Sequence, residues 1–161
     1  MPGFPENIID VLADEIGLQM KGLDAVLKRP LKPIDPDITI GIFTVDWEPS
    51  LPSAEMGGGL RTYGPTLGAY QFRIQYLIKH GDEEEGRTLY ALGTKNLRSI
   101  LAGASDLRVR LGELDEVSLG LHERVQRFGV RNQKFLNNEI QGTFMYLSST
   151  DFWVETESLP I

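Results

Sequence analysis

Two long runs near the C-terminal end of the chain alternate between hydrophobic and polar residues. A period of two is typical of β-strands, because successive side chains point to opposite faces of a sheet. The first run spans 123–135, and the second spans 143–157 with a Ser-Ser-Thr-Asp break at 148–151. Asn137-Asn138 and Gly142 supply turn chemistry between them. The pattern predicts a long antiparallel hairpin, which needs further strands or a helix on its apolar face.

Two earlier runs also have the period of a strand. Isoleucines alternate with other residues at 38–42, and residues 70–80 (YQFRIQYLIKH) alternate throughout except at Leu77. One face of 70–80 is predicted to be core and the other to be wet or to lie at a polar interface. Residues 107–111 alternate leucine and valine with arginine, which predicts a short strand or turn.

A spacing of three and four between apolar residues predicts helices elsewhere. The first opens at Pro5 and carries an apolar stripe that includes Ile8, Leu12 and Ile16, opposite an acidic face. A further short helix is predicted at 23–27. The longest runs from the acidic turn at 82–85 to Gly103. Asp82 and Glu85 have the spacing of a capping box, and carboxylates at a helix start are stabilised by about 0.3–1 kcal/mol each.

Residues 48–69 have no periodicity, with proline and glycine spread through them. The Gly57–Gly59 run is not followed by the Gly-Lys-Ser/Thr of a phosphate-binding loop. A segment of this length is either functional or disordered. It is either an arm that reaches a neighbouring subunit, with Arg61 and Tyr63 as contact residues, or a hairpin tip without a function.

The order of elements predicts an α+β fold, with an antiparallel β-sheet and helices packed on one face. The 161 residues are enough for a single domain, 1–161, from which the loop at 48–69 projects.

Composition narrows the class of protein. Hydrophobic residues make up 41% and charged residues 24%, which is ordinary for a soluble globular domain. There is no apolar run near 18 residues and no signal peptide, so no membrane contact is expected. The chain has no cysteine, which excludes disulfides, thiolate metal sites and cysteine nucleophiles. A net charge of −7 argues against a dedicated DNA-binding protein.

No catalytic motif is found. His80 and His122 lack ligand spacing to a second histidine or to a carboxylate, and no serine lies in a Gly-x-Ser-x-Gly motif. The carboxylates at 82–85 lack the alternating spacing and glycine of a calcium loop, so helix capping is preferred to metal binding. We therefore expect no catalytic residue, no cofactor and no metal, and the chain is not expected to be an enzyme.

Basic side chains cluster in the first run of the C-terminal hairpin. On an uninterrupted strand, Arg127 and Arg131 would share one face and flank Gly129, while Arg124 and Lys134 would share the other. Together with the acidic turn, they give the subunit two poles of opposite charge, which suits head-to-tail contacts that close a ring. The alternative is a solvated strand edge whose charges prevent aggregation. The predicted interface comprises Arg124, Arg127, Arg131, Lys134, Asp82, Glu83 and Glu84, with Arg61 and Tyr63 from the loop.

The run at 70–101, YQFRIQYLIKHGDEEEGRTLYALGTKNLRSIL, resembles the strand, acidic turn and helix of tail terminator proteins of long-tailed (siphovirus-type) bacteriophages. The ending at 124–157 and the acidic first helix are also similar. The resemblance implies an α+β subunit without catalysis, which forms a hexameric ring. This ring caps the tail tube, ends its elongation and provides the joining surface to the head. The long loop at 48–69 departs from the pattern, so no role is carried over to it.

Partners and location follow from the same resemblance. The partners would be further copies of the chain, the major tail tube protein and the head–tail connector proteins. Genome DNA would pass through the lumen without specific binding. The protein would lie at the head-proximal end of the tail in the virion, and in the host cytoplasm during assembly. Two other functions stay open: a head-completion or connector subunit of the same particle, and a small metal-dependent enzyme that uses the turn at 82–85.

Overall fold

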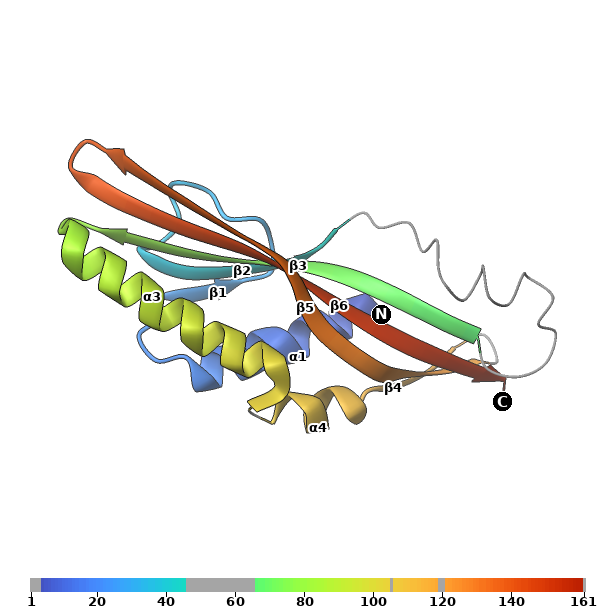
Figure 1. Ribbon diagram of the computed structural model, residues 1–161. Coiled ribbons are helices and arrows are strands. Elements are labelled where there is room, and N and C mark those ends of the chain that lie inside the picture. Colours follow the sequence, from blue (N-terminus) through green and yellow to red (C-terminus); the bar gives the residue numbers. More distant parts are fainter. Residues whose placement is uncertain (1–3, 46–65, 105, 119–120, 161) are drawn as a thin grey trace.

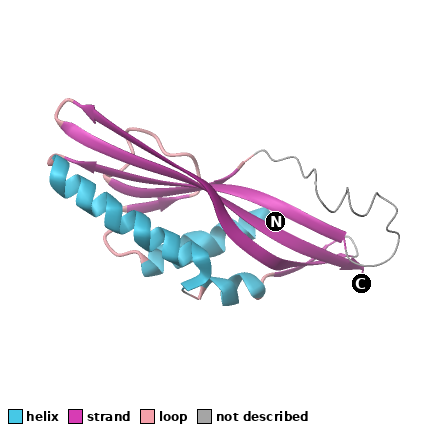
Figure 2. Cartoon of the chain, viewed as in Figure 1, coloured by secondary structure: helices cyan, strands magenta, loops and turns pink. Residues whose placement is uncertain are grey.

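The computed structural model of the chain describes residues 4–45, 66–104, 106–118 and 121–160. Within them, helices and strands follow one another in the order α1 (Phe4–Gln19), β1 (Ala25–Leu27), β2 (Ile38–Thr44), β3 (Thr66–His80), α3 (Glu83–Ser99), the π-helical turn η1 (Ile100–Ala104), α4 (Leu107–Gly112), β4 (Asp115–Ser118), β5 (Leu121–Ile140) and β6 (Thr143–Pro160). The strands form one sheet in the spatial order β1-β2-β3-β6-β5-β4. The helices lie on one side of this long, twisted sheet (Figure 1; Figure 2).

The predicted α+β class, with helices on one face, is confirmed. All pairs from β2 to β4 are antiparallel, but β1 pairs with β2 in parallel, with Val26 opposite Ile40. The helix predicted at 23–27 is therefore wrong. The chain turns at Gly22, which has a φ of 85°, and then runs along β2, where Asp24 N donates to Ile38 O at 2.7 Å. The backbone groups of this short segment thus gain ladder partners that one turn of helix would not supply.

The predicted C-terminal hairpin is present, but its turn and its continuity differ from expectation. The turn lies at Gln141 and Gly142, which both have positive φ (51° and 81°), and Asn137-Asn138 belongs to β5. Positive φ at both central residues is what a two-residue type I′ hairpin turn needs. The expected break at 148–151 is also wrong, because β6 is continuous. Its polar residues Ser148 and Thr150 are buried on the helix side of the sheet.

The prediction of a strand or turn at 107–111 is wrong as well, since this segment is α4. Leu107 and Leu111 are one helical turn apart and both are fully buried. Val109 lies between them on the opposite side and is 59% exposed. In a stretch of only five residues, apolar side chains at every second position fit a strand, and the first and fifth also share one face of a helix. The pattern alone therefore could not distinguish a helix from a strand.

The core lies between the helices and the sheet. Ile8, Leu12 and Ile16 of α1 are fully buried, as the helical spacing predicts. They join the same apolar cluster as Phe72 and Ile74 of β3. The remaining fully or almost fully buried members include Ile40, Ile42, Ile78, Leu97, Leu101, Leu107, Leu111, Phe152 and Val154.

Glycine lets α3 approach the sheet closely. A Cβ atom placed on Gly93 would lie 1.9 Å from the Oη atom of Tyr76, and one on Gly86 would lie 2.9 Å from the Cβ atom of His80. Beneath the helix, the ring of Tyr90 stacks on Tyr76 and on Tyr146 with centroid distances of 6.0 and 5.4 Å. Burial, and then the charge of Tyr90, raise the pKa of the Tyr76 hydroxyl to about 12.

The face of the sheet opposite the helices is covered at one end by the segment 28–36. A Cβ atom on Gly41 would lie 2.6 Å from the carbonyl oxygen of Arg29, so this segment lies against the backbone of β2. Lys79 Nζ donates to the carbonyl oxygens of Pro33 and Asp35 at 2.9 and 2.5 Å. This cover explains why Leu77, which is out of phase with the core positions of β3, is nevertheless only 3% exposed.

Asp35 holds the covering segment together. Its carboxylate accepts hydrogen bonds from Arg29 Nη1 and Nη2 at 3.0 and 2.5 Å and from Lys32 N at 2.6 Å. The hydrogen bonds from Arg29, followed by that from the Lys32 backbone, lower the pKa of Asp35 from 3.8 to about 2. The charged form is favoured because these donors bind a carboxylate more strongly than a protonated carboxyl group.

We predict that Gly93→Ala lowers the stability of the fold. The added methyl group would force α3 away from Tyr76, and overpacking of this kind costs about 1–3 kcal/mol, more than the gain of up to about 1 kcal/mol in helix propensity. Urea unfolding measures the difference. Gly17→Ala is the matched control, because a Cβ atom there would meet its nearest neighbour, Val26, at 4.0 Å. Equal stability of Gly93→Ala and the native chain would show that α3 is not held this close.

A second prediction concerns acid. Because the pKa of Asp35 is lower in the folded state, its carboxylate stabilises the fold above the ordinary pKa of 3.8, and this contribution is lost as the pH falls toward 2. The melting temperature of Asp35→Asn should therefore lie below that of the native chain at neutral pH, and the gap should close between about pH 4 and pH 2. Asp37→Asn, at an exposed side chain, is the control. A difference in melting temperature that does not change with pH would contradict the lowered pKa of Asp35.

Candidate functional site

Most of β5 is a free edge of the sheet. β4 pairs only with Leu121–Arg124, whereas β6 follows β5 to the end of the hairpin. From Val125 to Ile140, the described residues supply no strand to the other side of β5. A long edge leaves a row of backbone N–H and C=O groups that can pair with another chain. It is therefore the first surface to consider for a function.

Two β-bulges decide which side chains border this edge. The register between β5 and β6 shifts between Val125 and Arg127 and again between Arg131 and Lys134, with one extra residue in β5 each time. Each extra residue reverses the alternation of faces. As a result, four basic residues lie opposite odd-numbered residues of β6, on the face away from the helices: Arg124 opposite Glu157, Arg127 opposite Glu155, Arg131 opposite Asp151 and Lys134 opposite Ser149.

The prediction for these four residues is therefore partly wrong. Arg127 and Arg131 share one face and flank Gly129, as expected. Arg124 and Lys134 were expected on the opposite face, but the bulges bring them to the same one. All four now point away from the core, so the basic side chains form one row on the sheet instead of being divided between its faces.

Trp153 fills the gap in the middle of this row. It lies directly opposite Gly129, and a Cβ atom on that glycine would lie 2.6 Å from Cζ2 of the indole. The guanidinium carbons of Arg127 and Arg131 lie 5.8 and 5.9 Å from the centroid of the Trp153 ring. Such cation–π contacts stabilise both the position and the orientation of a guanidinium group. The residue pattern alone does not reveal the role of Trp153, because its partners are set by the bulges.

The two arginines differ in their ion pairs. Arg127 binds Glu155 of its own chain, with Nη2 at 3.1 Å from Oε1, and this raises the pKa of Arg127. Asp151, the cross-strand neighbour of Arg131, is bound instead by Arg73 Nε at 3.0 Å. Arg131 has no ion pair to another described residue. Arg127 is thus already committed within the chain, whereas the guanidinium of Arg131 is available.

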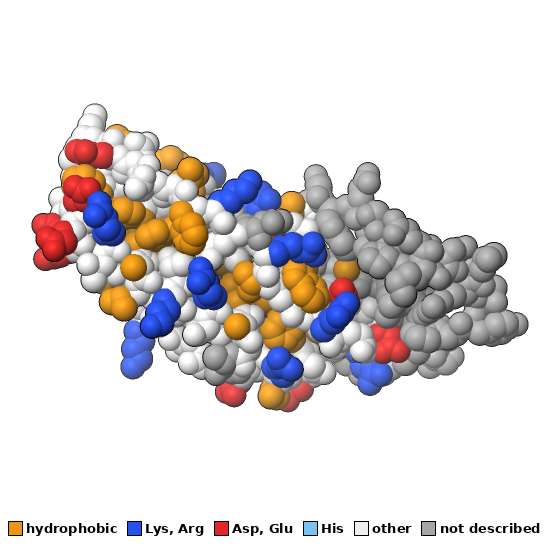
Figure 3. Space-filling model, in the orientation of Figure 1, with side chains coloured by type: hydrophobic (Ala, Val, Ile, Leu, Met, Phe, Trp, Pro, Cys, Tyr) orange, Lys and Arg blue, Asp and Glu red, His pale blue; other side chains and the backbone are white. Residues whose placement is uncertain are grey.

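Further cations lie on the helices, and one of them contacts this edge. Arg98 of α3 donates to the side chain of Gln133 on β5. Lys95 and Arg108 are exposed and, like Arg124 and Lys134, form no ion pair to a described residue. Figure 3 shows the helix side, with Lys and Arg spread along the middle among hydrophobic side chains, and with acidic groups at the end where α3 begins, along the lower edge and toward the opposite end. The free edge is therefore basic in a protein whose net charge is −7.

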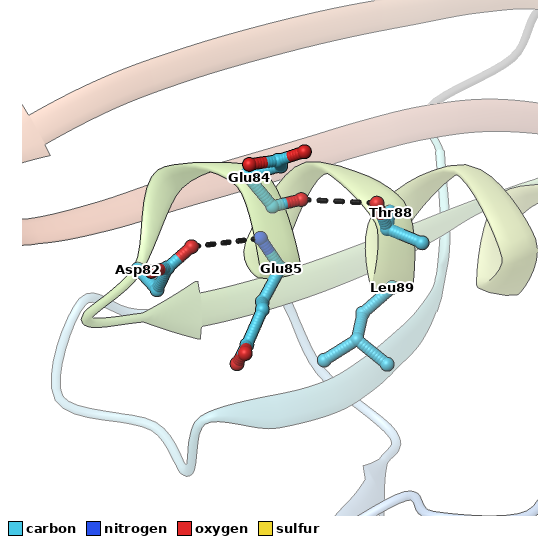
Figure 4. A pocket seen from close by; sticks show the side chains of 5 residues that line it. All are labelled: Asp82, Glu84, Glu85, Thr88 and Leu89. Atoms are coloured by element: carbon cyan, nitrogen blue, oxygen red, sulfur yellow. Dashed lines mark hydrogen bonds between the residues drawn. The ribbon is translucent and has the colours of Figure 1, made fainter.

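The acidic turn caps α3, as predicted. Asp82 Oδ1 accepts from Glu85 N at 2.9 Å, and Glu84 O accepts from Thr88 Oγ1 at 3.0 Å (Figure 4). Glu83 pairs with Arg87 at 2.8 Å. Together with Leu89, residues of this turn line an open hollow. The part of the chain that the structure describes holds no group of three or more His, Cys, Asp or Glu placed to bind a metal ion.

A second hollow, of about 190 Å³, lies between the start of α3 and the tip of the hairpin. It combines carboxylate, amide and aromatic groups, and Tyr146 Oη donates to Glu83 O at its base at 3.1 Å. We call it the tip hollow. It is lined by Glu83, Asn137, Asn138, Glu139, Phe144 and Tyr146.

Some expected contact residues lie outside the described part of the chain. These are Arg61 and Tyr63, with the rest of the predicted loop up to residue 65. The last four residues of that predicted loop, 66–69, belong to β3. Among the helices of the described ranges, none has both the length and the hydropathy to span a membrane.

Comparison with known proteins gives little further guidance. No family model matches the chain, and no curated protein matches it. One similar solved structure is a chain of the "Virion of native gene transfer agent (GTA) particle", at 13% sequence identity and a TM-score of 0.41. The match covers 94% of this chain and 94% of that one. A TM-score this low supports no argument about function.

We predict that Gly129→Ala displaces the indole of Trp153. The new methyl group would overlap the ring, so Trp153 should move toward solvent and its fluorescence should shift to longer wavelength, with a stability loss of about 1–3 kcal/mol. A Trp47→Phe background leaves Trp153 as the only tryptophan. Gly112→Ala is the control, since no atom lies within 4 Å of a Cβ there. An unchanged spectrum would mean that the indole does not rest on Gly129.

Proposed function

We propose that this protein is a structural subunit of a tailed-phage-like particle, and specifically a tail terminator. In this proposal, copies of the chain form a ring, which is a hexamer. The ring caps the tail tube, ends its elongation and presents the surface to which the head is joined. Its partners are the major tail tube protein and the head–tail connector proteins, and it resides in the virion.

The observation that carries this proposal is the free basic edge of β5. An exposed edge of this length, bordered by Arg131 and Lys134 without anionic partners in the described chain, suits contact with another subunit. The opposite charge is available on the same chain, at the acidic start of α3. A subunit with complementary surfaces at different places makes heterologous contacts, and these give a closed ring when the rotation closes.

The choice of a terminator over other ring proteins rests on the sequence resemblance at 70–101 and 124–157. The activity of such a protein would consist of contacts alone. One side of the ring would dock on the last ring of the tube and the other would receive the head. A net charge of −7 fits a lumen through which DNA slides without being bound, because phosphate is repelled by most of the protein.

We predict that the purified protein, with tail tubes present, sediments as a ring of six copies of the 18.0 kDa chain. Charge reversal at Arg127→Glu and Arg131→Glu together should block assembly and leave the circular dichroism spectrum unchanged, because both side chains lie outside the core. Truncating one desolvated partner of an ion pair costs about 2–5 kcal/mol. Sedimentation and electron microscopy measure the assembly.

Lys21→Glu, at an exposed residue that precedes β1 at the other end of the sheet, is the control for a surface charge reversal, with half the change in net charge of the double variant. A monomer at all concentrations, with no ring on isolated tubes, would contradict the proposal. Copurification with head connectors and not with tail tubes would favour a connector subunit. If the double variant forms normal rings, these arginines are solvated edge residues that do not contribute to assembly.

A further inference from the structure

We propose that the tip hollow of one copy accepts the guanidinium group of Arg131 from a second copy. The inference rests on the proposed ring and names the contact that would join its subunits. Such a contact requires a hollow suited to a planar cation and an unpaired cation of the right shape. It also requires that the hollow and the cation of one chain cannot reach each other.

The tip hollow has the chemistry of a guanidinium site. Glu83 and Glu139 contribute carboxylates to its lining and Asn137 contributes an amide, while the amide oxygen of Asn138 accepts from Glu139 N at 2.9 Å. The carboxylate of Glu139 is exposed and has no ion pair within the described chain, while that of Glu83 has a solvent-exposed partner in Arg87. Carboxylates bind the planar fork of arginine through two hydrogen bonds.

The aromatic part of the hollow favours arginine over lysine. Phe144 and Tyr146 line it beside the carboxylates, and Tyr146 is held in place by its bond to Glu83 O. A guanidinium group stacks on aromatic rings and is less strongly hydrated than an ammonium group. The pairing of arginine with an aromatic ring is already present in this protein at Trp153.

The hairpin tip also exposes apolar area, with Phe135 on the face of the hollow and Leu136 and Ile140 on the opposite face. Phe135, Leu136 and Ile140 are 53%, 67% and 48% exposed, although large apolar side chains are usually covered. They lie on the part of β5 whose edge is free. Exposed apolar groups on an unprotected edge, beside a polar hollow, are typical of a surface that another subunit covers.

Arg131 is the best donor among the free cations. It has no carboxylate partner in the described chain, it borders the free edge, and Trp153 restrains its guanidinium in advance, so that less entropy is lost on binding. Within one chain it cannot reach the tip hollow. Arg131 points away from the helices, opposite Asp151, whereas Asn137 and Glu139 lie opposite Tyr146 and Phe144 on the helix side. The contact therefore needs a second copy.

The test is a charge swap read by ring assembly. Glu139→Arg and Arg131→Glu should each raise the protein concentration needed for half-maximal ring formation by at least about tenfold. The double variant, Glu139→Arg with Arg131→Glu, should restore assembly to near the native level, because the pair is re-formed with reversed polarity. Glu139→Gln, which removes only charge, should weaken assembly in the same direction.

Glu113→Arg is the control for reversing a carboxylate, since Glu113 is exposed and belongs neither to the tip hollow nor to the predicted interface. Melting temperatures of all variants should equal that of the native chain, because these side chains are exposed. Native-like assembly of both single variants, no rescue in the double variant, or an equal defect in Glu113→Arg would overturn the tip hollow as the acceptor while leaving the ring intact. Absence of any ring from the native chain would overturn the proposed function together with this contact.

Discussion

The pairing of β3 with β6 is the interaction on which the rest of the structure depends. It is continuous from Thr66 opposite Ser158 to His80 opposite Phe144, without a register shift. The two strands come from distant parts of the chain. The positions of the elements that lie between them in the sequence therefore depend on this one ladder. Its unbroken alternation places Phe72, Ile74 and Phe152 on the same side, where the helices pack. The opposite side receives polar and charged residues, including Arg73 and Asp151.

β5 departs from this regularity, and the departure creates the candidate site. Because β6 is already fixed on its far side by β3, an extra residue in β5 cannot shift β6 and must bulge on the free side. The bulges bring Arg124 and Lys134 to the face that holds Arg127 and Arg131. A regular strand would have placed two cations over the apolar core. The same bulges interrupt the edge, which limits uncontrolled pairing, while the stretch from Phe135 to Ile140 stays regular and exposed.

The sequence was most informative where one period runs without interruption for many residues. The strand at 70–80 and the first helix keep a single period over ten residues or more, and both were predicted with the correct apolar faces. The exception is Glu15, which was expected on the solvated face of the helix but is buried and pairs with Arg110. The Asp82 cap depends on local chemistry and was also predictable. Short segments failed, because 107–111 fits two periods and 25–27 is a strand only through its partner β2. The faces of Arg124 and Lys134 could not be predicted, since a bulge depends on the neighbouring strand and leaves no mark in the alternation itself.

Net charge gives a misleading description of this surface, since the position of each charge matters more than the total. Many of the acidic side chains are engaged within the chain: Asp35 with Arg29, Asp151 with Arg73 and Glu155 with Arg127. The charges that remain for a partner are those of side chains without an ion pair in the described chain. These charges are negative at the hairpin tip and positive along the middle of β5. Screening limits such interactions to about 8 Å at physiological ionic strength. Two acidic subunits that repel each other at long range can therefore still attract at contact, provided that Glu139 of one meets an unpaired cation of the other. A requirement for close approach in a fixed orientation favours a closed ring over open aggregation.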